Sequence, residues 1–177
     1  MNHLPIFKET RTAKVSLLVI LVGTIFWLGG INIRAVIGND ILIMGTLDFE
    51  PNINPLVERS VFGLISKSSI VIFISYIVIW IAGITFLTTT RLRLKQNGWL
   101  MMSAILFYIF TPVEIYTLVL DGRMIYQDLF TQGELVEFRK LLIHRIAALS
   151  GVPIIAQFCY YTIIGLVVFQ PLKRYDT

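Results

Sequence analysis

The feature that most constrains the fold of this chain is a long uncharged run between Lys95 and Glu114, which stays apolar as far as Leu120. A bilayer core about 30 Å thick needs roughly 20 apolar residues of helix, and residues 97–120 meet that length. The run therefore predicts a membrane-spanning helix rather than an amphipathic helix of a soluble protein. Pro112 predicts a kink in this span, because proline removes one hydrogen bond of the helix backbone.

Three further runs of similar character indicate an all-α membrane protein, a four-transmembrane-helix bundle built as a single domain of residues 1–177. The predicted spans are residues 15–36, 68–90, 97–120 and 147–171. Hydrophobic residues make up 56% of the chain and charged residues 15%, with a mean hydropathy of +0.77, which is more apolar than a typical soluble domain. A signal peptide is the alternative for the first run. We expect an uncleaved span there, because the run exceeds the usual apolar length of about 7–15 residues and no small-residue cleavage site follows it.

The basic residues predict how the chain is oriented in the membrane. They gather before the first span, between the second and third spans, and after the fourth: Lys8, Arg11 and Lys14, then Arg91, Arg93 and Lys95, then Lys173 and Arg174. Basic residues near span ends favour the cytoplasmic side, so both termini are predicted to be cytoplasmic. The same pattern explains the net charge of +4, and we infer no nucleic-acid partner from that charge. The single cysteine, Cys159, and the lack of a glycosylation motif agree with a bacterial inner membrane as the expected location.

The two outward connections, residues 37–67 and 121–146, are each predicted to contain an amphipathic helix at the outer interface. Asn54 and Pro55 form a helix start, with asparagine as the N-cap and proline at the first helical position. This first helix either lies in the interface or runs directly into the second span. The second helix is predicted from Gly133 to about Ile146, and both connections are expected to be ordered.

One face of the first span is predicted to pack against another helix. Gly23, Trp27, Gly30 and Arg34 recur at helical spacing and share a stripe. Small residues allow another helix to approach closely. The alternative is that these glycines are scattered without a packing role.

The up-down-up-down arrangement gathers polar residues at the outer ends of the spans. This candidate polar cluster consists of Arg34, Glu114, Asp121, Arg123, His144 and Arg145. An ionisable group within a span costs about 2.5–3.5 kcal/mol and usually faces the bundle interior or a water-filled cavity. We predict that Arg34 and Glu114 meet, directly or through one bound polar group. The alternative is that these side chains extend to the headgroup region.

No motif in the sequence indicates a reaction, so the sequence favours a protein without catalytic activity and predicts neither catalytic residues nor a metal site. The cofactor is unknown. His3 and His144 are predicted on opposite sides of the membrane, which rules out a bis-histidine haem within one chain. A haem shared with another subunit, or a chlorophyll, ligated by His144 is the alternative.

The predicted function is that of a non-catalytic integral membrane subunit or accessory protein of a larger membrane complex. Its expected partners are the lipid bilayer and other membrane protein subunits. The alternative is a small carrier or redox-linked protein that binds a lipid, a quinone or a proton at the outer polar cluster.

Overall fold

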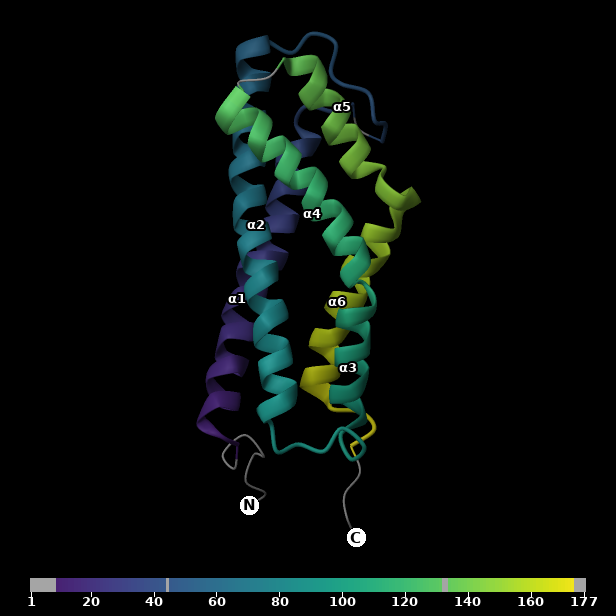
Figure 1. Ribbon diagram of the computed structural model, residues 1–177. Coiled ribbons are helices and arrows are strands. Elements are labelled where there is room, and N and C mark those ends of the chain that lie inside the picture. Colours follow the sequence, from purple (N-terminus) through teal and green to yellow (C-terminus); the bar gives the residue numbers. More distant parts are fainter. Residues whose placement is uncertain (1–8, 44, 132–133, 174–177) are drawn as a thin grey trace.

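The structure is a computed structural model, and it describes residues 9–43, 45–131 and 134–173 (Figure 1). These residues are almost entirely helical, and the predicted all-α bundle is confirmed. The elements are α1 (Arg11–Asn39), α2 (Pro55–Thr89), α3 (Gly98–Ile109), α4 (Thr111–Tyr126), η2 (Gln127–Thr131), α5 (Leu135–Ile146), η3 (Ala148–Gly151) and α6 (Val152–Phe169). The predicted helix start at Gly133 lies outside the described residues.

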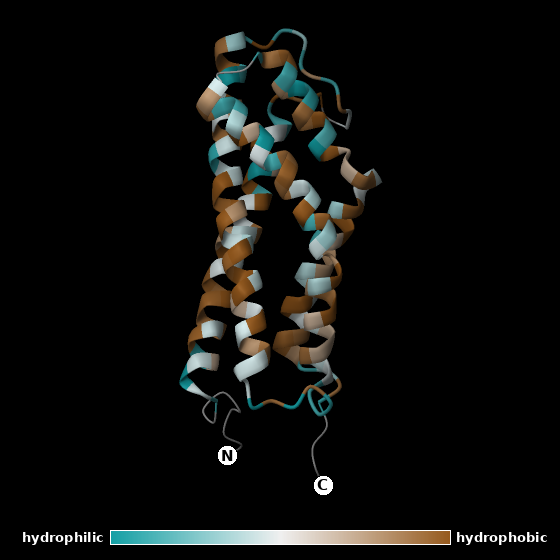
Figure 2. Ribbon diagram, in the orientation of Figure 1, coloured by the Kyte–Doolittle hydropathy of each residue, from teal (hydrophilic) through white to brown (hydrophobic). Residues whose placement is uncertain are grey.

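Three helical segments are long and apolar enough to cross a membrane: Arg11–Asn39, Pro55–Thr89 and Leu135–Phe169. The pair Gly98–Ile109 and Thr111–Thr131, bent by 41°, is apolar and long enough to be a fourth when it is counted as one broken span. The bend lies at Phe110, and Pro112 follows in the first turn of α4, so the predicted kink is confirmed. Figure 2 shows hydrophobic residues along all four spans.

The bundle has two different ends, which we call the terminal end and the cap end. α1 begins and α6 ends at the terminal end, whereas α5, η2 and the connection of residues 40–54 cover the cap end (Figure 1). The cap has its own apolar core, in which Phe62 of α2 and Phe138 of α5 stack with ring centroids 4.3 Å apart. Glu58 is fully buried beneath it and accepts two hydrogen bonds from Arg139, at 2.5 and 2.6 Å.

The two predicted outer helices are realised differently. The second is α5, and its neighbour α6 begins after a short turn in which Leu149, Ser150 and Gly151 have positive φ. The first is the N-terminal part of α2, which continues into the second span without a break. At 1.5 Å per residue, the 35 residues of α2 extend over about 50 Å, so roughly 20 Å of it projects beyond a bilayer core.

α1 and α2 form the most extensive helix pair of the bundle. A Cβ atom on Gly23 would lie 2.7 Å from Ile79, and one on Gly30 would lie 2.8 Å from Ile72, so both positions need glycine for this close approach. Trp27 lies between them and is 2% exposed. The stripe on the first span therefore faces the bundle interior.

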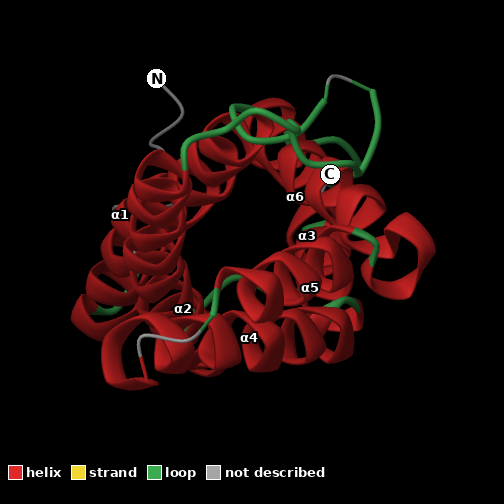
Figure 3. Cartoon of the chain, turned by 90° about the horizontal axis from the view of Figure 1, so that it is seen from above, coloured by secondary structure: helices red, strands yellow, loops and turns green. Residues whose placement is uncertain are grey.

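The third span changes its neighbours at the bend. α3 packs against α6, whereas α4 crosses to α2 and α5. Seen along the bundle, the α1–α2 pair lies on one side and the α3–α6 pair on the other (Figure 3). This divergence leaves a hollow between the two helix pairs.

Candidate functional site

A buried ion triad joins three helices where the cap meets the bundle. Asp121 of α4 is 0% exposed and accepts hydrogen bonds from Arg34 of α1 at 2.7 Å and from Arg145 of α5 at 3.0 Å. Arg34 also donates to the hydroxyl of Ser69 on α2, at 3.1 Å. Because every charge in the triad has a partner, its arrangement indicates a structural clamp.

Of the two forms in which Arg34 and Glu114 were predicted to meet, the direct contact is wrong, because the carboxylate that Arg34 contacts belongs to Asp121. A contact through one bound polar group stays a prediction. The third span stays helical beyond its predicted end at Leu120, so Asp121 lies on the same face of α4 as Glu114, two turns nearer the cap. At that position Asp121, and not Glu114, lies within hydrogen-bonding distance of Arg34. Glu114 is buried and accepts a hydrogen bond from the hydroxyl of Tyr160, at 3.1 Å.

The two other members of the predicted cluster do not join the triad. His144 lies on the exposed side of α5, where a ring nitrogen is 2.8 Å from the hydroxyl of Tyr116. Arg123 is exposed. The polar cluster is therefore divided into the triad, the Glu114–Tyr160 pair and two surface residues. Within the described residues, no group of three histidine, cysteine or acidic side chains is arranged to hold a metal ion.

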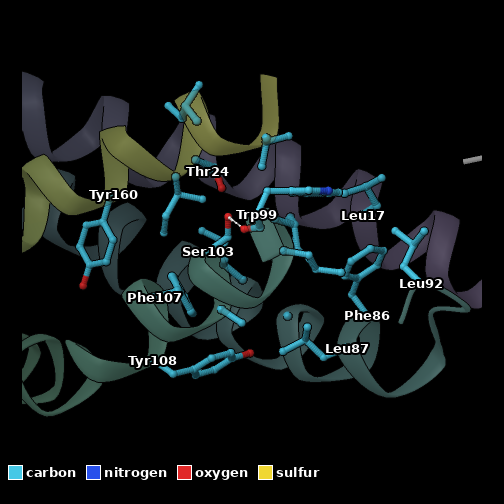
Figure 4. A pocket seen from close by; sticks show the side chains of 18 of the residues that line it. Leu17, Thr24, Phe86, Leu87, Leu92, Trp99, Ser103, Phe107, Tyr108 and Tyr160 are labelled. Carbon is cyan, nitrogen blue, oxygen red and sulfur yellow. Dashed lines mark hydrogen bonds between the residues drawn. The ribbon is translucent and has the colours of Figure 1, made fainter. Parts of the chain in front are cut away.

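An apolar hollow among the described residues lies elsewhere, in the half of the bundle toward the terminal end. It is a cavity of about 230 Å³ between the α1–α2 pair and the α3–α6 pair. Figure 4 shows side chains from both pairs pointing into it. Its apolar wall includes Leu17, Phe86, Leu92, Trp99, Phe107 and Ile163.

Hydroxyl groups in the cavity wall are mostly engaged with the backbone. Ser103 donates to the carbonyl oxygen of Trp99 at 2.8 Å (Figure 4). Tyr108 donates to the carbonyl oxygen of Trp80 at 3.2 Å. Thr24 contributes one further hydroxyl. The wall therefore has the character of a site for an apolar molecule.

The two ends of the cavity differ in chemistry. Toward the cap the lining includes an aromatic group of Trp27, Phe107 and Tyr160, in which the rings of Trp27 and Tyr160 lie 4.6 Å apart. Toward the terminal end the lining includes the polar side chains of Glu9, Lys14 and Gln170. A molecule held here would meet mostly apolar groups along its length and charged or amide groups toward the terminal end.

The sequence placed a ligand site at the polar cluster and gave no indication of this cavity. Its wall combines residues from four helices that are far apart in the chain. Of the aromatic residues that line it toward the cap, Trp27 belongs to the predicted packing stripe of the first span, whereas Phe107 and Tyr160 belong to no pattern that the sequence analysis identified.

No protein-family model matches the chain, and neither does any curated protein or solved structure. Fold and site together define a class, a multi-pass α-helical membrane protein with an apolar cavity inside its bundle.

Proposed function

We propose that this protein binds one apolar chain of a lipophilic molecule in the cavity between its two helix pairs. The observation that carries the proposal is the contrast between a mostly apolar wall and the polar side chains that line the cavity toward the terminal end. Cavities with apolar walls bind apolar molecules in preference to water. In a membrane, lipid chains are the most abundant apolar molecules available.

The length of the cavity favours a chain over a compact molecule. Two residues that line the cavity, Lys14 toward the terminal end and Trp27 toward the cap, are separated by about 20 Å along α1, at 1.5 Å per residue. This distance is two thirds of a bilayer core of about 30 Å. The proposed occupant is therefore an extended acyl or isoprenoid chain, and the proposed role is binding or carriage without catalysis.

The proposal predicts that a large side chain in the cavity wall displaces the occupant. Ala104 of α3 lines the cavity, whereas its neighbour Ile105 is 49% exposed on the outside of the same helix. Ala104→Phe should lower the amount of co-purified lipophile about tenfold, since a loss of about 1.4 kcal/mol in binding is a tenfold change. Native mass spectrometry of protein purified in mild detergent measures this.

Ile105→Phe is the matched control, because it adds the same ring to the same helix but points away from the cavity. It should retain the wild-type amount of bound lipophile. Equal occupancy in both variants would contradict the proposal, and so would a wild-type protein that purifies with no lipophile.

For location, we propose a bacterial inner membrane with both termini in the cytoplasm, as the basic residues at the terminal end support. A cysteine at Gln96, between α2 and α3, should then be labelled only from the cytoplasmic side, and one at Asn52, in the cap connection, only from outside. An impermeant thiol reagent on intact cells measures this, in a Cys159→Ser background. Labelling of Gln96→Cys in intact cells would contradict this orientation and show that the loop between α2 and α3 faces outward. Gln132, the other position predicted to face outward, lies outside the described residues.

A second candidate function is that of an accessory subunit of a larger membrane complex. The observation that favours it is a group of exposed apolar side chains on the cap. Phe130 is 73% exposed and its ring stacks on that of Tyr126, and Leu56 and Leu129 are also exposed. Exposed apolar groups of this kind often mark protein interfaces. Native electrophoresis in mild detergent separates the candidates, because a subunit migrates as a large complex and a carrier migrates as a monomer or small oligomer.

A further inference from the structure

We infer that two copies of this protein associate within the membrane through a polar face of α1 and α6, with the side chains of Gln157 from both copies hydrogen-bonded to each other. The polar face consists of Asn32, Gln157 and Tyr161. The inference goes beyond the proposed function, because these three residues are not among those that line the cavity.

The polar face lies on the outside of the bundle, at the depth of a bilayer core. Tyr161 is near the middle of α6, about 12–14 Å from either end of this helix at 1.5 Å per residue. Asn32 and Tyr161 are exposed, and Gln157 is half-buried. Polar side chains within membrane spans usually face other protein groups, because lipid chains offer them no hydrogen bond. We therefore expect a molecule with polar groups to cover this face.

The three side chains are bonded to one another and leave one acceptor unused. The amide nitrogen of Gln157 donates to Oδ1 of Asn32 at 3.1 Å and to the hydroxyl oxygen of Tyr161 at 3.0 Å. The hydroxyl of Tyr161 donates to the same Oδ1 at 2.9 Å, and Nδ2 of Asn32 donates to the hydroxyl oxygen at 2.7 Å. The side-chain oxygen of Gln157 accepts no hydrogen bond from any residue that the structure describes.

A second copy of the chain supplies both groups that Gln157 needs. A carboxamide is a donor and an acceptor, so two such groups related by a two-fold axis form two reciprocal N–H···O bonds. Each amide nitrogen then keeps its bond to Asn32 and exchanges its bond to Tyr161 for one to the second copy. Tyr161 remains bonded to Asn32 in this arrangement. A different protein would have to present a donor and an acceptor at matching positions, whereas symmetry provides them.

The backbone beside the polar face is open to another helix. Gly29 lies about one turn from Asn32 on α1, and Gly165 lies about one turn from Tyr161 on α6. A Cβ atom on either glycine would meet nothing within 4 Å, so no other part of the described chain fills these positions. Small residues allow a helix of a second copy to approach closely enough for the short amide side chains to meet.

The test counts the copies in each particle after reconstitution of purified protein into vesicles at low protein density. One dye is attached to Gln96→Cys, in the loop between α2 and α3, in a Cys159→Ser background, and photobleaching steps are counted. The otherwise unchanged protein should bleach in two steps. Gln157→Leu should raise the dissociation constant of the dimer about tenfold, because it removes both reciprocal bonds and keeps a side chain of similar size.

Thr162→Val is the matched control for Gln157→Leu. Thr162 is exposed on the same helix, but its hydroxyl already donates to the backbone carbonyl oxygen of Phe158, at 3.0 Å. Loss of this hydroxyl should leave the dissociation constant unchanged. Loss of dimers in this variant as well would contradict a specific role of Gln157.

Cross-linking provides a second measurement that leaves the polar face intact. Ile154 is 55% exposed and lies one turn from Gln157 on α6. Ile154→Cys in the Cys159→Ser background should form a disulfide between two copies on oxidation. Ile105→Cys, on the outside of α3, should not.

The remaining outcomes would overturn the inference. A protein that bleaches in one step at every ratio of protein to lipid does not associate with itself. Equal dimerisation of the wild type and Gln157→Leu, or no cross-link at Ile154→Cys, would show that copies meet through another surface. A monomer that loses a co-purified lipid or another protein on the change Gln157→Leu would assign the polar face to that molecule.

Discussion

Replacement of Asp121 by asparagine should lower the free energy of unfolding by about 3–5 kcal/mol, because it leaves two buried arginines without the carboxylate that both contact. The side chains of Arg34 and Arg145 are only 10% and 15% exposed, so water replaces little of the lost interaction. Thermal unfolding in mild detergent measures the change. Asp48→Asn is the matched control: Asp48 is exposed in the cap connection, and its replacement should have little effect.

A double-mutant cycle tests whether the effect comes from the ion pair. Arg34→Gln combined with Asp121→Asn should be less harmful than the sum of the two single changes, since the second change removes a charge that the first left unpaired. Strictly additive effects would show that the two residues act independently.

The second large effect is expected in the cap. Phe138 is 1% exposed and stacks on Phe62, so loss of its ring alone should cost about 3–5 kcal/mol, and a buried carboxylate in its place costs more. Phe138→Asp should therefore detach α5 and prevent assembly of a stable protein, as measured by the yield of monodisperse protein after purification. Val61→Asp, at a half-buried position packed on the same core, should have a smaller effect.

Lys140→Ala is the control for Phe138→Asp, because Lys140 is exposed on the same helix. It should leave yield and stability unchanged. Equal tolerance of all three replacements would contradict the ordered cap and show that α5 is a loosely attached surface helix.

Most of the bundle could be predicted from the sequence, because the bilayer imposes a length and a polarity on every helix that crosses it. Uncharged runs indicated each span, Pro112 indicated the bend, and the glycine stripe indicated the face of α1 that approaches α2. Each of these features depends on residues that are close together in the chain. Local patterns were sufficient for them.

The partner of Arg34 could not be predicted, because the end of a span and the end of its helix do not coincide. The sequence placed Asp121 at the exit from the membrane, yet α4 continues as far as Tyr126. Asp121 therefore lies on the same face of α4 as Glu114, at the same depth in the bundle as Arg34. The Glu58–Arg139 pair was missed for a related reason, since both residues resemble solvated charges until α5 folds onto α2.

The bend at Phe110 has a consequence for how cavity and cap depend on each other. On the terminal side of the bend this span packs against α6, and on the cap side it packs against α2 and α5. The cavity between the helix pairs and the cover over the cap end therefore both result from the same change of direction. A straight third span would pack against the same neighbouring helix along its whole length. Packed along α2 throughout, it would fill the cavity that a bound molecule needs. Packed along α6 throughout, it would leave the cap end uncovered. The capacity to bind a molecule in the cavity therefore depends on the same bend that covers the cap end.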